Sequence, residues 1–265
     1  MSSSIKYSIC STIYNSANTL EAALKPLCNL GHEFEIIIID NFSADNTVEI
    51  LKQYDRNVQF LQMKCTRGSG RQRAIELSNG EFVIQVDLDV KYVGISNIIR
   101  ENEELLQNYI LNIQSKNTKC NAPIIIGKKI FFDKIGGYPN LNHVEDIYLY
   151  KKAEALDLIK YVENNYPHEC LNVGGKSSGV ESRYEKSIYR KIVRRAIACR
   201  DLIFVSGATY NEVMKRYKLF GLKKVYQGIP LFFTGKFLSL FIKVPDLDKE
   251  IMRLKNLYKV PNDSQ

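Results

Sequence analysis

GEFVIQVDLD, residues 80–89, is the stretch that decides the fold. Residues 82–86 have the length and the valine, isoleucine and phenylalanine content of a buried strand, with a glycine turn before them. Asp87 and Asp89 follow at its carboxyl end, and residues two apart in an extended chain point to the same side, so we expect both carboxylates to converge on one spot. Such an oxygen pair favours Mg²⁺ or Mn²⁺ with a substrate phosphate completing the shell, although an acidic turn after a strand would read the same.

Strands and helices alternate on the N-terminal side of this stretch. We predict strands at residues 7–13, 36–39 and 58–63, and helices at residues 18–27, from a Ser43 or Asp45 cap to Tyr54, and at residues 67–78. The continuous apolar run at residues 36–39 is typical of a central parallel strand that is covered on both faces. The pattern predicts an α/β fold with a doubly wound, mostly parallel sheet, whose ligands bind beyond the carboxyl ends of the strands.

Polar segments recur in order at these predicted strand ends. They are Tyr14-Asn15, the acidic turn Asp40-Asn41-Phe42-Ser43-Ala44-Asp45, the stretch Arg67-Gly68-Ser69-Gly70-Arg71, and the aspartate pair after Gly80. Farther along come Ile130 to Tyr138 with Gly136-Gly137, and then Glu145-Asp146 at a predicted helix start. This succession resembles the family-2 glycosyltransferases of the GT-A fold over roughly residues 5–170. The resemblance implies a Rossmann-like GT-A domain that transfers a sugar from a nucleoside diphosphate sugar to an acceptor hydroxyl or phosphate, with inversion.

The resemblance also assigns roles to individual residues. Asp89 is expected to bind Mg²⁺ or Mn²⁺, and Asp87 to bind the ribose, the metal or a metal-bound water. Arg71 and Arg67 would reach the diphosphate, helped by the backbone amides that open their helix. Asp146 is the expected catalytic base, with Glu145 in support, whereas the same pair on its own would only complement the helix dipole.

Five further residues fall where the family binds the nucleotide: Thr12, Tyr14, Asn15, Asp40 and Asn41. Thr12 stands where the family often has proline, and Asn41 where it often has the aspartate that reads the base. The donor is therefore expected to be UDP- or GDP-linked, with the base left open.

His168 is a weaker candidate. A single histidine in a polar loop is usually structural, but relatives often place a histidine here that approaches the metal, so His168 is kept as a third metal ligand. The loop at residues 174–179 is interpreted either as a flap over the site or as a plain linker.

Charge divides the chain into two parts. Residues 181–265 hold 18 Lys and Arg against 8 Asp and Glu, whereas residues 1–180 hold 19 against 21. We therefore predict a catalytic domain at 1–180 and a basic helical region at 181–265, with a helix at residues 184–204 and an apolar, lysine-flanked segment at residues 229–243. That region is expected either to lie in a membrane interface or to pack on the protein or a second subunit as a homo-oligomer.

The cysteines and the apolar runs of the sequence bear on the cellular compartment. The six cysteines are scattered without zinc spacing, which favours a reducing compartment, and Cys10 and Cys65 are expected to be buried thiols. No signal-peptide pattern or apolar run long enough to span a bilayer is visible. We therefore expect a cytoplasmic protein, either free or bound peripherally to the inner face of the membrane. The expected acceptor is a glycan or a polyprenyl-phosphate lipid.

Two other functions compete with glycosyl transfer. A nucleotidyltransferase would need a Gly-rich phosphate loop after the first strand, where this chain has Tyr14-Asn15-Ser16-Ala17. A non-catalytic scaffold could use the basic region to bind membrane or nucleic acid, but no nucleic-acid-binding motif is visible and no such partner is expected.

Overall fold

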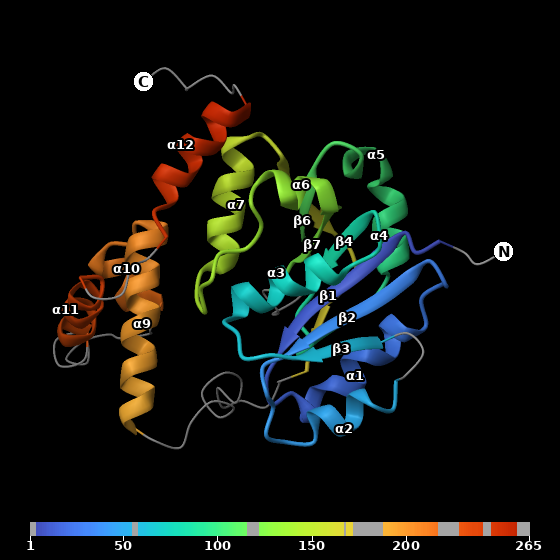
Figure 1. Cartoon of the computed structure of the whole chain (residues 1–265), viewed down its shortest axis with the longest axis horizontal. Coiled ribbons are helices and arrows are strands. Elements are labelled where there is room, and N and C mark those ends of the chain that lie inside the picture. Colours follow the sequence, from blue (N-terminus) through green and yellow to red (C-terminus); the bar gives the residue numbers. More distant parts are fainter. Residues whose placement is uncertain are drawn as a thin grey trace.

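A seven-stranded sheet forms the centre of the molecule (Figure 1). The computed structural model describes residues 4–54, 58–115, 122–166, 168–171, 188–216, 228–240 and 245–258. The strand order is β3-β2-β1-β4-β7-β6-β8. The strands are β1 (Tyr7–Ile13), β2 (Phe34–Asp40), β3 (Val58–Gln62), β4 (Phe82–Gln85), β6 (Ile110–Ser115), β7 (Ile124–Lys128) and β8 (Ile159–Asn164).

Most of this sheet is parallel, as predicted. β1 pairs in parallel with both β2 and β4, β2 with β3, and β6 with β8, whereas β7 runs antiparallel to its neighbours β4 and β6. The carboxyl ends of β1, β2, β3 and β4 therefore lie along one edge of the sheet, where the polar segments follow.

Helices cover both faces of the sheet, which explains the unbroken apolar run of β2. Ile36 and Ile38 point into one core cluster, and Ile37 and Ile39 into the other. The first cluster is closed by α1 (Ala17–Cys28), α2 (Thr47–Leu51), α4 (Ile95–Glu101) and α5 (Glu103–Leu106). The second is closed by α3 (Arg67–Leu77), α6 (Lys129–Lys134) and α7 (Glu145–Ala155).

Three local predictions need correction. α2 begins at Thr47 with Asn46 at its N-cap and ends at Leu51. Ser43 is not the cap because its hydroxyl donates to Asp40, whereas Asp45 accepts from the N–H and the hydroxyl of Thr47. Cys65 is only partly buried, whereas Cys10 is fully buried. Cys170 is disulfide-bonded, which the scattered cysteines did not predict.

A second, two-stranded sheet lies next to the aspartate pair. It joins β5 (Val90–Tyr92) to β9 (His168–Cys170) in antiparallel pairing, with Tyr92 opposite His168. His168 is thus in a strand, not in a polar loop, and it is 3% exposed. The loop at residues 174–179 lies outside the described residues.

Four helices follow in the C-terminal region: α9 (Ile188–Ser206), α10 (Tyr210–Arg216), α11 (Ile229–Leu238) and α12 (Leu247–Tyr258). α9 lies beside α7, and α10 and α11 pack on α9, on the far side of the molecule from α4 and α5 (Figure 1). α12 returns to the body, because Leu254 is buried in the same cluster as Ile75 and Leu149. The proposed boundary at residue 180 therefore separates segments of sequence that share one core.

Candidate functional site

The loops after β1 and β2 are tied to each other by side-chain hydrogen bonds. Asn15, whose φ is +48°, accepts a hydrogen bond at Oδ1 from the Ala44 N–H (2.8 Å), and its own N–H donates to Ser43 Oγ (2.7 Å). Asp45 accepts from the Ala17 N–H at 3.1 Å. The polar side chains of the acidic turn thus bind the loop after β1 to the loop after β2 and fix their relative position.

Asp40 and Asn41 are part of the same framework. Asp40 is fully buried, and its carboxylate accepts from the Ser43 N–H and hydroxyl and from Gln62 Nε2 (2.9 Å). Asn41 Oδ1 accepts from the Cys65 N–H at 3.0 Å. The structure therefore shows Asp40 holding a turn, and a role in contacting a base or ribose would require these bonds to open.

Thr12 and Tyr14 lie at the end of β1, against the start of α3. A Cβ on Gly70 would lie 2.5 Å from Thr12 Cγ2, so only glycine allows α3 to approach this closely. Thr12 Oγ1 is buried and has no hydrogen-bond partner among the described residues. Tyr14 is partly exposed at the same strand end.

The first turn of α3 does not offer free amides to an anion. The Arg67 N–H donates to Asn142 Oδ1 (3.0 Å), the Gly68 N–H to the Leu141 carbonyl (2.8 Å), and the Ser69 N–H to Thr66 Oγ1 (3.1 Å). The N–H of the N-cap residue, Thr66, donates to Ser69 Oγ at 2.9 Å. These are the four donors that a helix start leaves without an intrahelical partner. All four already have protein acceptors, so the prediction that they help to bind the diphosphate was wrong.

Arg71 is the centre of the site. Its guanidinium donates to Asp87 Oδ1 at 2.7 Å and lies 3.1 Å from Glu145 Oε1, while its side chain is only 9% exposed. Burial acts to lower the pKa of Arg71, but Asp87 and Glu145 outweigh it and raise the pKa well above its usual range. The guanidinium also lies over the ring of Tyr138, 5.6 Å from its centroid.

Glu145 and Asp146 form the first turn of α7, after Val144 in a left-handed conformation (φ +56°). Glu145 is 1% exposed and also lies 3.7 Å from Arg67, whose side chain is 40% exposed. Burial raises the pKa of Glu145, and the two arginines oppose that rise. Asp146 is only partly buried, so of the pair it is the carboxylate that solvent reaches.

Asp87 and Asp89 lie in a turn, since β4 ends at Gln85 and the Val90 N–H donates to the Asp87 carbonyl. The argument from alternation along a strand was therefore wrong, although both residues do follow the strand's carboxyl end. The Asp87 side chain is 46% exposed and Asp89 is partly exposed. Tyr92, buried next to the pair, accepts the Asp87 N–H at its hydroxyl (3.2 Å).

The structure does not gather His168 with the two aspartates. Its ring lies against Tyr92, with centroids 4.9 Å apart, and its Nδ1 lies 3.1 Å from the Ala122 carbonyl. Burial lowers the pKa of His168, which favours the neutral ring. Within the described ranges, no group of three or more histidine, cysteine or carboxylate side chains is placed to hold a metal ion.

Sequence reasoning named Tyr138 as part of the Gly136-Gly137 segment but did not place it beside Arg71, and it did not single out Tyr150. Tyr138 is buried with its hydroxyl lacking a hydrogen-bond partner in the described part of the chain. Tyr150 lies one turn after Asp146 on α7, and burial raises the pKa of both tyrosines. The spacing of Asp146 and Tyr150, four residues apart on a helix, was the signal that could have placed Tyr150 on this face.

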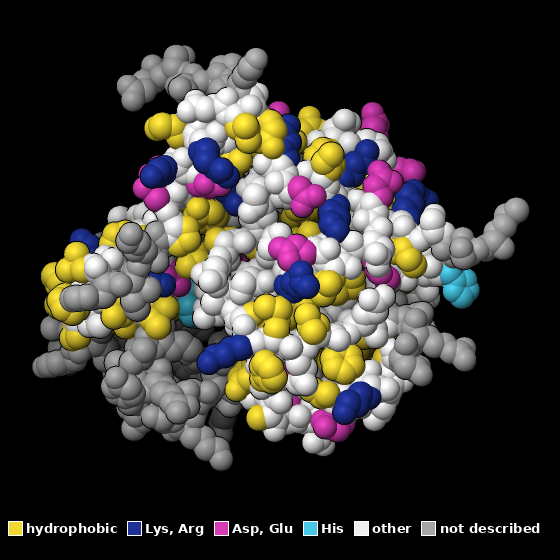
Figure 2. All heavy atoms as spheres, viewed as in Figure 1, with side chains coloured by type: hydrophobic (Ala, Val, Ile, Leu, Met, Phe, Trp, Pro, Cys, Tyr) yellow, Lys and Arg dark blue, Asp and Glu magenta, His cyan; other side chains and the backbone are white. Residues whose placement is uncertain are grey.

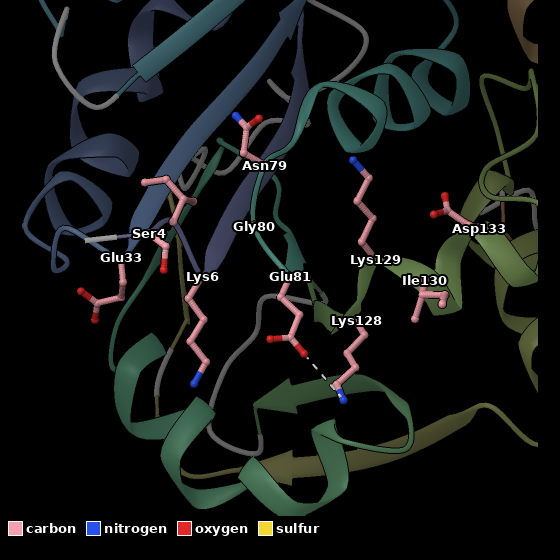
Figure 3. A pocket seen from close by; sticks show the side chains of 11 residues that line it. Ser4, Lys6, Glu33, Asn79, Gly80, Glu81, Lys128, Lys129, Ile130 and Asp133 are labelled. Atoms are coloured by element: carbon pink, nitrogen blue, oxygen red, sulfur yellow. Dashed lines mark ion pairs between the residues drawn. The ribbon is translucent and has the colours of Figure 1, made fainter. Parts of the chain in front are cut away.

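A surface pocket of about 850 Å³ lies elsewhere, near the start of β1 and β4 (Figure 3). Lys6, Glu81, Lys128 and Asp133 are among its lining residues, and Lys128 pairs with Glu81 at 3.7 Å. It contains none of the predicted site residues, so it is separate from the cluster around Arg71.

Comparison with known proteins identifies relatives of the N-terminal part. Residues 8–93 match the model of glycosyl transferase family 2. A poly(ribitol-phosphate) beta-glucosyltransferase of Bacillus spizizenii is 31% identical over 105 residues, which is 36% of this chain and 16% of that protein. The glycosyltransferase YibD of Escherichia coli is 33% identical over 127 residues, or 46% of this chain and 35% of that protein. The chain thus spans about a sixth of the length of the first relative and about a third of the second.

Solved structures share the fold. Staphylococcus aureus TarS (residues 1–349) in complex with UDP-GlcNAc superposes with a TM-score of 0.56 at 17% identity, over 96% of this chain and 80% of that one. The mannosyltransferase PcManGT of Pyrobaculum calidifontis, in complex with GDP-Man and Mn²⁺, gives a TM-score of 0.54 at 11% identity, over 97% and 88%. At such identities the likeness shows the fold alone.

Proposed function

We propose that the chain is a family-2 glycosyltransferase of the GT-A fold and that it transfers a sugar from a nucleoside diphosphate sugar to an acceptor hydroxyl or phosphate, with inversion. The family match favours this chemistry over nucleotidyl transfer and over a non-catalytic scaffold. UDP and GDP are the candidate carriers, because the solved complexes of similar fold hold UDP-GlcNAc and GDP-Man.

One observation carries the proposal: Arg71 contacts both Asp87 and Glu145. Asp87 belongs to the turn after β4, and Glu145 to the first turn of α7. The candidate donor turn and the candidate base helix are therefore held together by one buried cation. A residue that made only one of these contacts would not link the two halves of a transfer site.

A divalent cation fits the donor set at this turn. Asp87 and Asp89 supply carboxylate oxygens with partial exposure, and hard oxygen ligands suit Mg²⁺ or Mn²⁺ when a substrate phosphate shares the coordination. Such an ion, when bound, would neutralise charge on the leaving diphosphate. The complexes of PcManGT and of a Mycobacterium tuberculosis glucosyl-3-phosphoglycerate synthase contain Mn²⁺.

We assign different roles to the two carboxylates at the start of α7. The partly exposed Asp146 is the proposed base: it takes the proton of the acceptor hydroxyl as the acceptor oxygen bonds to the anomeric carbon and the bond from that carbon to the diphosphate oxygen breaks. Glu145 is enclosed by Arg71 and Arg67, so its proposed role is to orient the arginines. The nucleoside diphosphate then leaves. The proposed acceptor is a glycan, whose hydroxyl needs this base, or a polyprenyl-phosphate lipid, whose ionised phosphate oxygen would attack without one.

Isothermal titration with a panel of UDP- and GDP-sugars, with and without Mn²⁺, tests this function. We expect one donor to bind in the presence of Mn²⁺, and Asp89→Ala to lose that binding. Asp133→Asn, in the pocket at the opposite end of the sheet, is the matched control and should bind normally. Absence of binding to every donor by a folded protein, or equal binding by Asp89→Ala, would refute the proposed donor site.

A further inference from the structure

Helix α11 is apolar on all sides, yet only one face is covered. Thr234 and Lys236 are its only polar side chains. Its inner face packs on α9 at Gly235, where a Cβ would lie 3.1 Å from the Arg200 backbone nitrogen and 3.2 Å from Cys199 Sγ. A helix that is hydrophobic all round is normally buried all round.

The outward face carries a stripe of large apolar side chains, which we call the α11 stripe. Its members are Ile229 (41% exposed), Phe233 (64%), Phe237 (58%) and Leu240 (76%), the last just past the helix end. Steps of four, four and three residues keep them on one side of a helix. Figure 2 shows hydrophobic side chains gathered over this part of the molecule, at the left of the view. An exposed apolar patch of this kind marks an interaction surface.

The charge of the segment that contains α11 favours one kind of partner. Between Glu212 and Asp246 the sequence holds seven Lys or Arg residues and no carboxylate. A second copy docked through α11 would bring two such cationic segments together, which is unfavourable. An anionic lipid surface supplies the opposite charge as well as an apolar layer for the stripe.

Helix α11 is too short to cross a bilayer. Its ten residues rise about 15 Å, roughly half the thickness of the hydrocarbon core. Nowhere in the described ranges is there a helix with the length and apolar character needed to cross a bilayer. If α11 contacts a bilayer, it therefore lies along the boundary between the headgroups and the acyl chains.

We propose that the α11 stripe docks the chain on the surface of an anionic membrane. The side chains of Phe233 and Leu240 enter the boundary between headgroups and acyl chains, and Lys236 contacts lipid phosphates. This inference does not depend on the proposed chemistry, because it rests on α11 and its surroundings alone.

The helices that flank α11 in the sequence, α9 and α12, pack against α7 next to the candidate site. Val205 of α9 and Leu247 of α12 are buried against Leu141 and Tyr148, and Tyr148 lies on α7. Lys151 Nζ of α7 also donates to the Val205 carbonyl at 3.4 Å. Membrane docking through α11 would accordingly hold the helix that begins with Glu145 and Asp146 at a constant place relative to the lipid surface.

Flotation of the full chain with vesicles tests the proposal. Vesicles of phosphatidylcholine alone are compared with vesicles that also contain phosphatidylglycerol. We expect binding to the anionic vesicles, and a loss of about tenfold or more for Phe233→Ser/Leu240→Ser. Lys236→Glu should weaken binding by at least about fivefold, since each lysine near the surface contributes about that factor.

Two variants serve as matched controls. Ile130→Ser removes a side chain that is 66% exposed on α6, and Lys25→Glu reverses an exposed charge on α1, so both should float like the parent chain. The proposal is overturned if the parent chain ignores anionic vesicles at low salt, or if the α11 variants and the controls float equally. It is also overturned if light scattering shows a dimer that Phe233→Ser/Leu240→Ser dissociates while vesicle binding is absent.

Discussion

Arg71 is surrounded by negative charge from two directions, and its planar guanidinium suits that position. Asp87 and Glu145 approach it from different elements, and the ring of Tyr138 covers one face. A guanidinium offers five N–H donors in a rigid plane whose face can also stack on a ring, whereas an ammonium is a compact charge with three rotatable donors. The buried Glu145 depends on this cation for its charge.

Removal of the cation alone should therefore cost more than removal of the whole pair. Arg71→Met leaves Glu145 buried beside the more distant Arg67, and we expect a loss of about 3 kcal/mol in the free energy of unfolding. In Arg71→Met/Glu145→Gln the buried charge is gone, so the double variant should be more stable than Arg71→Met. Urea unfolding measures both, and strictly additive losses would contradict a coupled pair.

Asp146 is predicted to affect turnover and not donor binding. Asp146→Asn keeps the size of the side chain but cannot accept the acceptor proton, so we expect turnover to fall by about 10²- to 10⁴-fold. Release of nucleoside diphosphate gives the rate, and titration calorimetry gives the affinity for the donor. Asp133→Asn should retain both values, and normal turnover by Asp146→Asn would remove this residue from the mechanism.

At the scale of elements, the loop before α7 is held by a buried lysine. Lys152 of α7 is 2% exposed, and its Nζ donates to the Gly137 carbonyl at 2.8 Å. Gly136 and Gly137 both have positive φ (+71° and +58°), a conformation that glycine adopts without strain. Because Tyr138 follows directly, Lys152 helps to place the ring under Arg71.

Lys152 should make stability depend on pH. Burial lowers the pKa of Lys152 to about 8, with Glu250 of α12 opposing the shift and Arg253 adding to it. The unfolded chain binds the extra proton between this pKa and the ordinary value of 10.5, so the cost of burying the charge is complete below pH 8 and disappears as the pH rises.

Relative to Lys152→Met, the parent chain should therefore gain about 2–3 kcal/mol of unfolding free energy between about pH 7 and pH 10. Chemical denaturation of both chains across this range provides the measurement. The difference between them isolates Lys152 from other groups that titrate there. A constant difference would mean that the lysine keeps its ordinary pKa in the folded state.

At the scale of the whole molecule, the C-terminal region packs against the body that contains the sheet at one end and is exposed at the other. α12 contributes Leu254 to the core cluster under α7, whereas the α11 stripe remains uncovered. The basic region thus combines two functions that composition could not separate: attachment to the sheet and presentation of an apolar surface.

A pair of leucines on α12 tests the attachment. Leu254 is 2% exposed, and Leu254→Ala should lower the free energy of unfolding by about 2–4 kcal/mol through the lost contacts and the cavity. Leu257, three residues later and 63% exposed, is the matched control and should change stability by less than about 0.5 kcal/mol on truncation. If both variants are equally stable, α12 does not belong to the core.

The mostly parallel sheet and the position of the polar segments at the strand ends could be predicted from the sequence alone. These features are local: an apolar run such as residues 36–39, or an acidic turn such as residues 40–45, can be interpreted from neighbouring residues alone. Tyr7–Ile13 was predicted with both ends correct, because a turn follows it directly. The proposed roles of the site residues stay predictions.

Only the tertiary structure decided which polar groups meet. It placed Arg71 between Asp87 and Glu145, engaged Asp40 and the amides of α3 with protein partners, and moved His168 into a strand against Tyr92. It also showed that α11 buries one apolar face and exposes the other. The physical reason is that hydrogen bonds, ion pairs and burial depend on distances between segments far apart in the chain, which no local pattern of residue types contains.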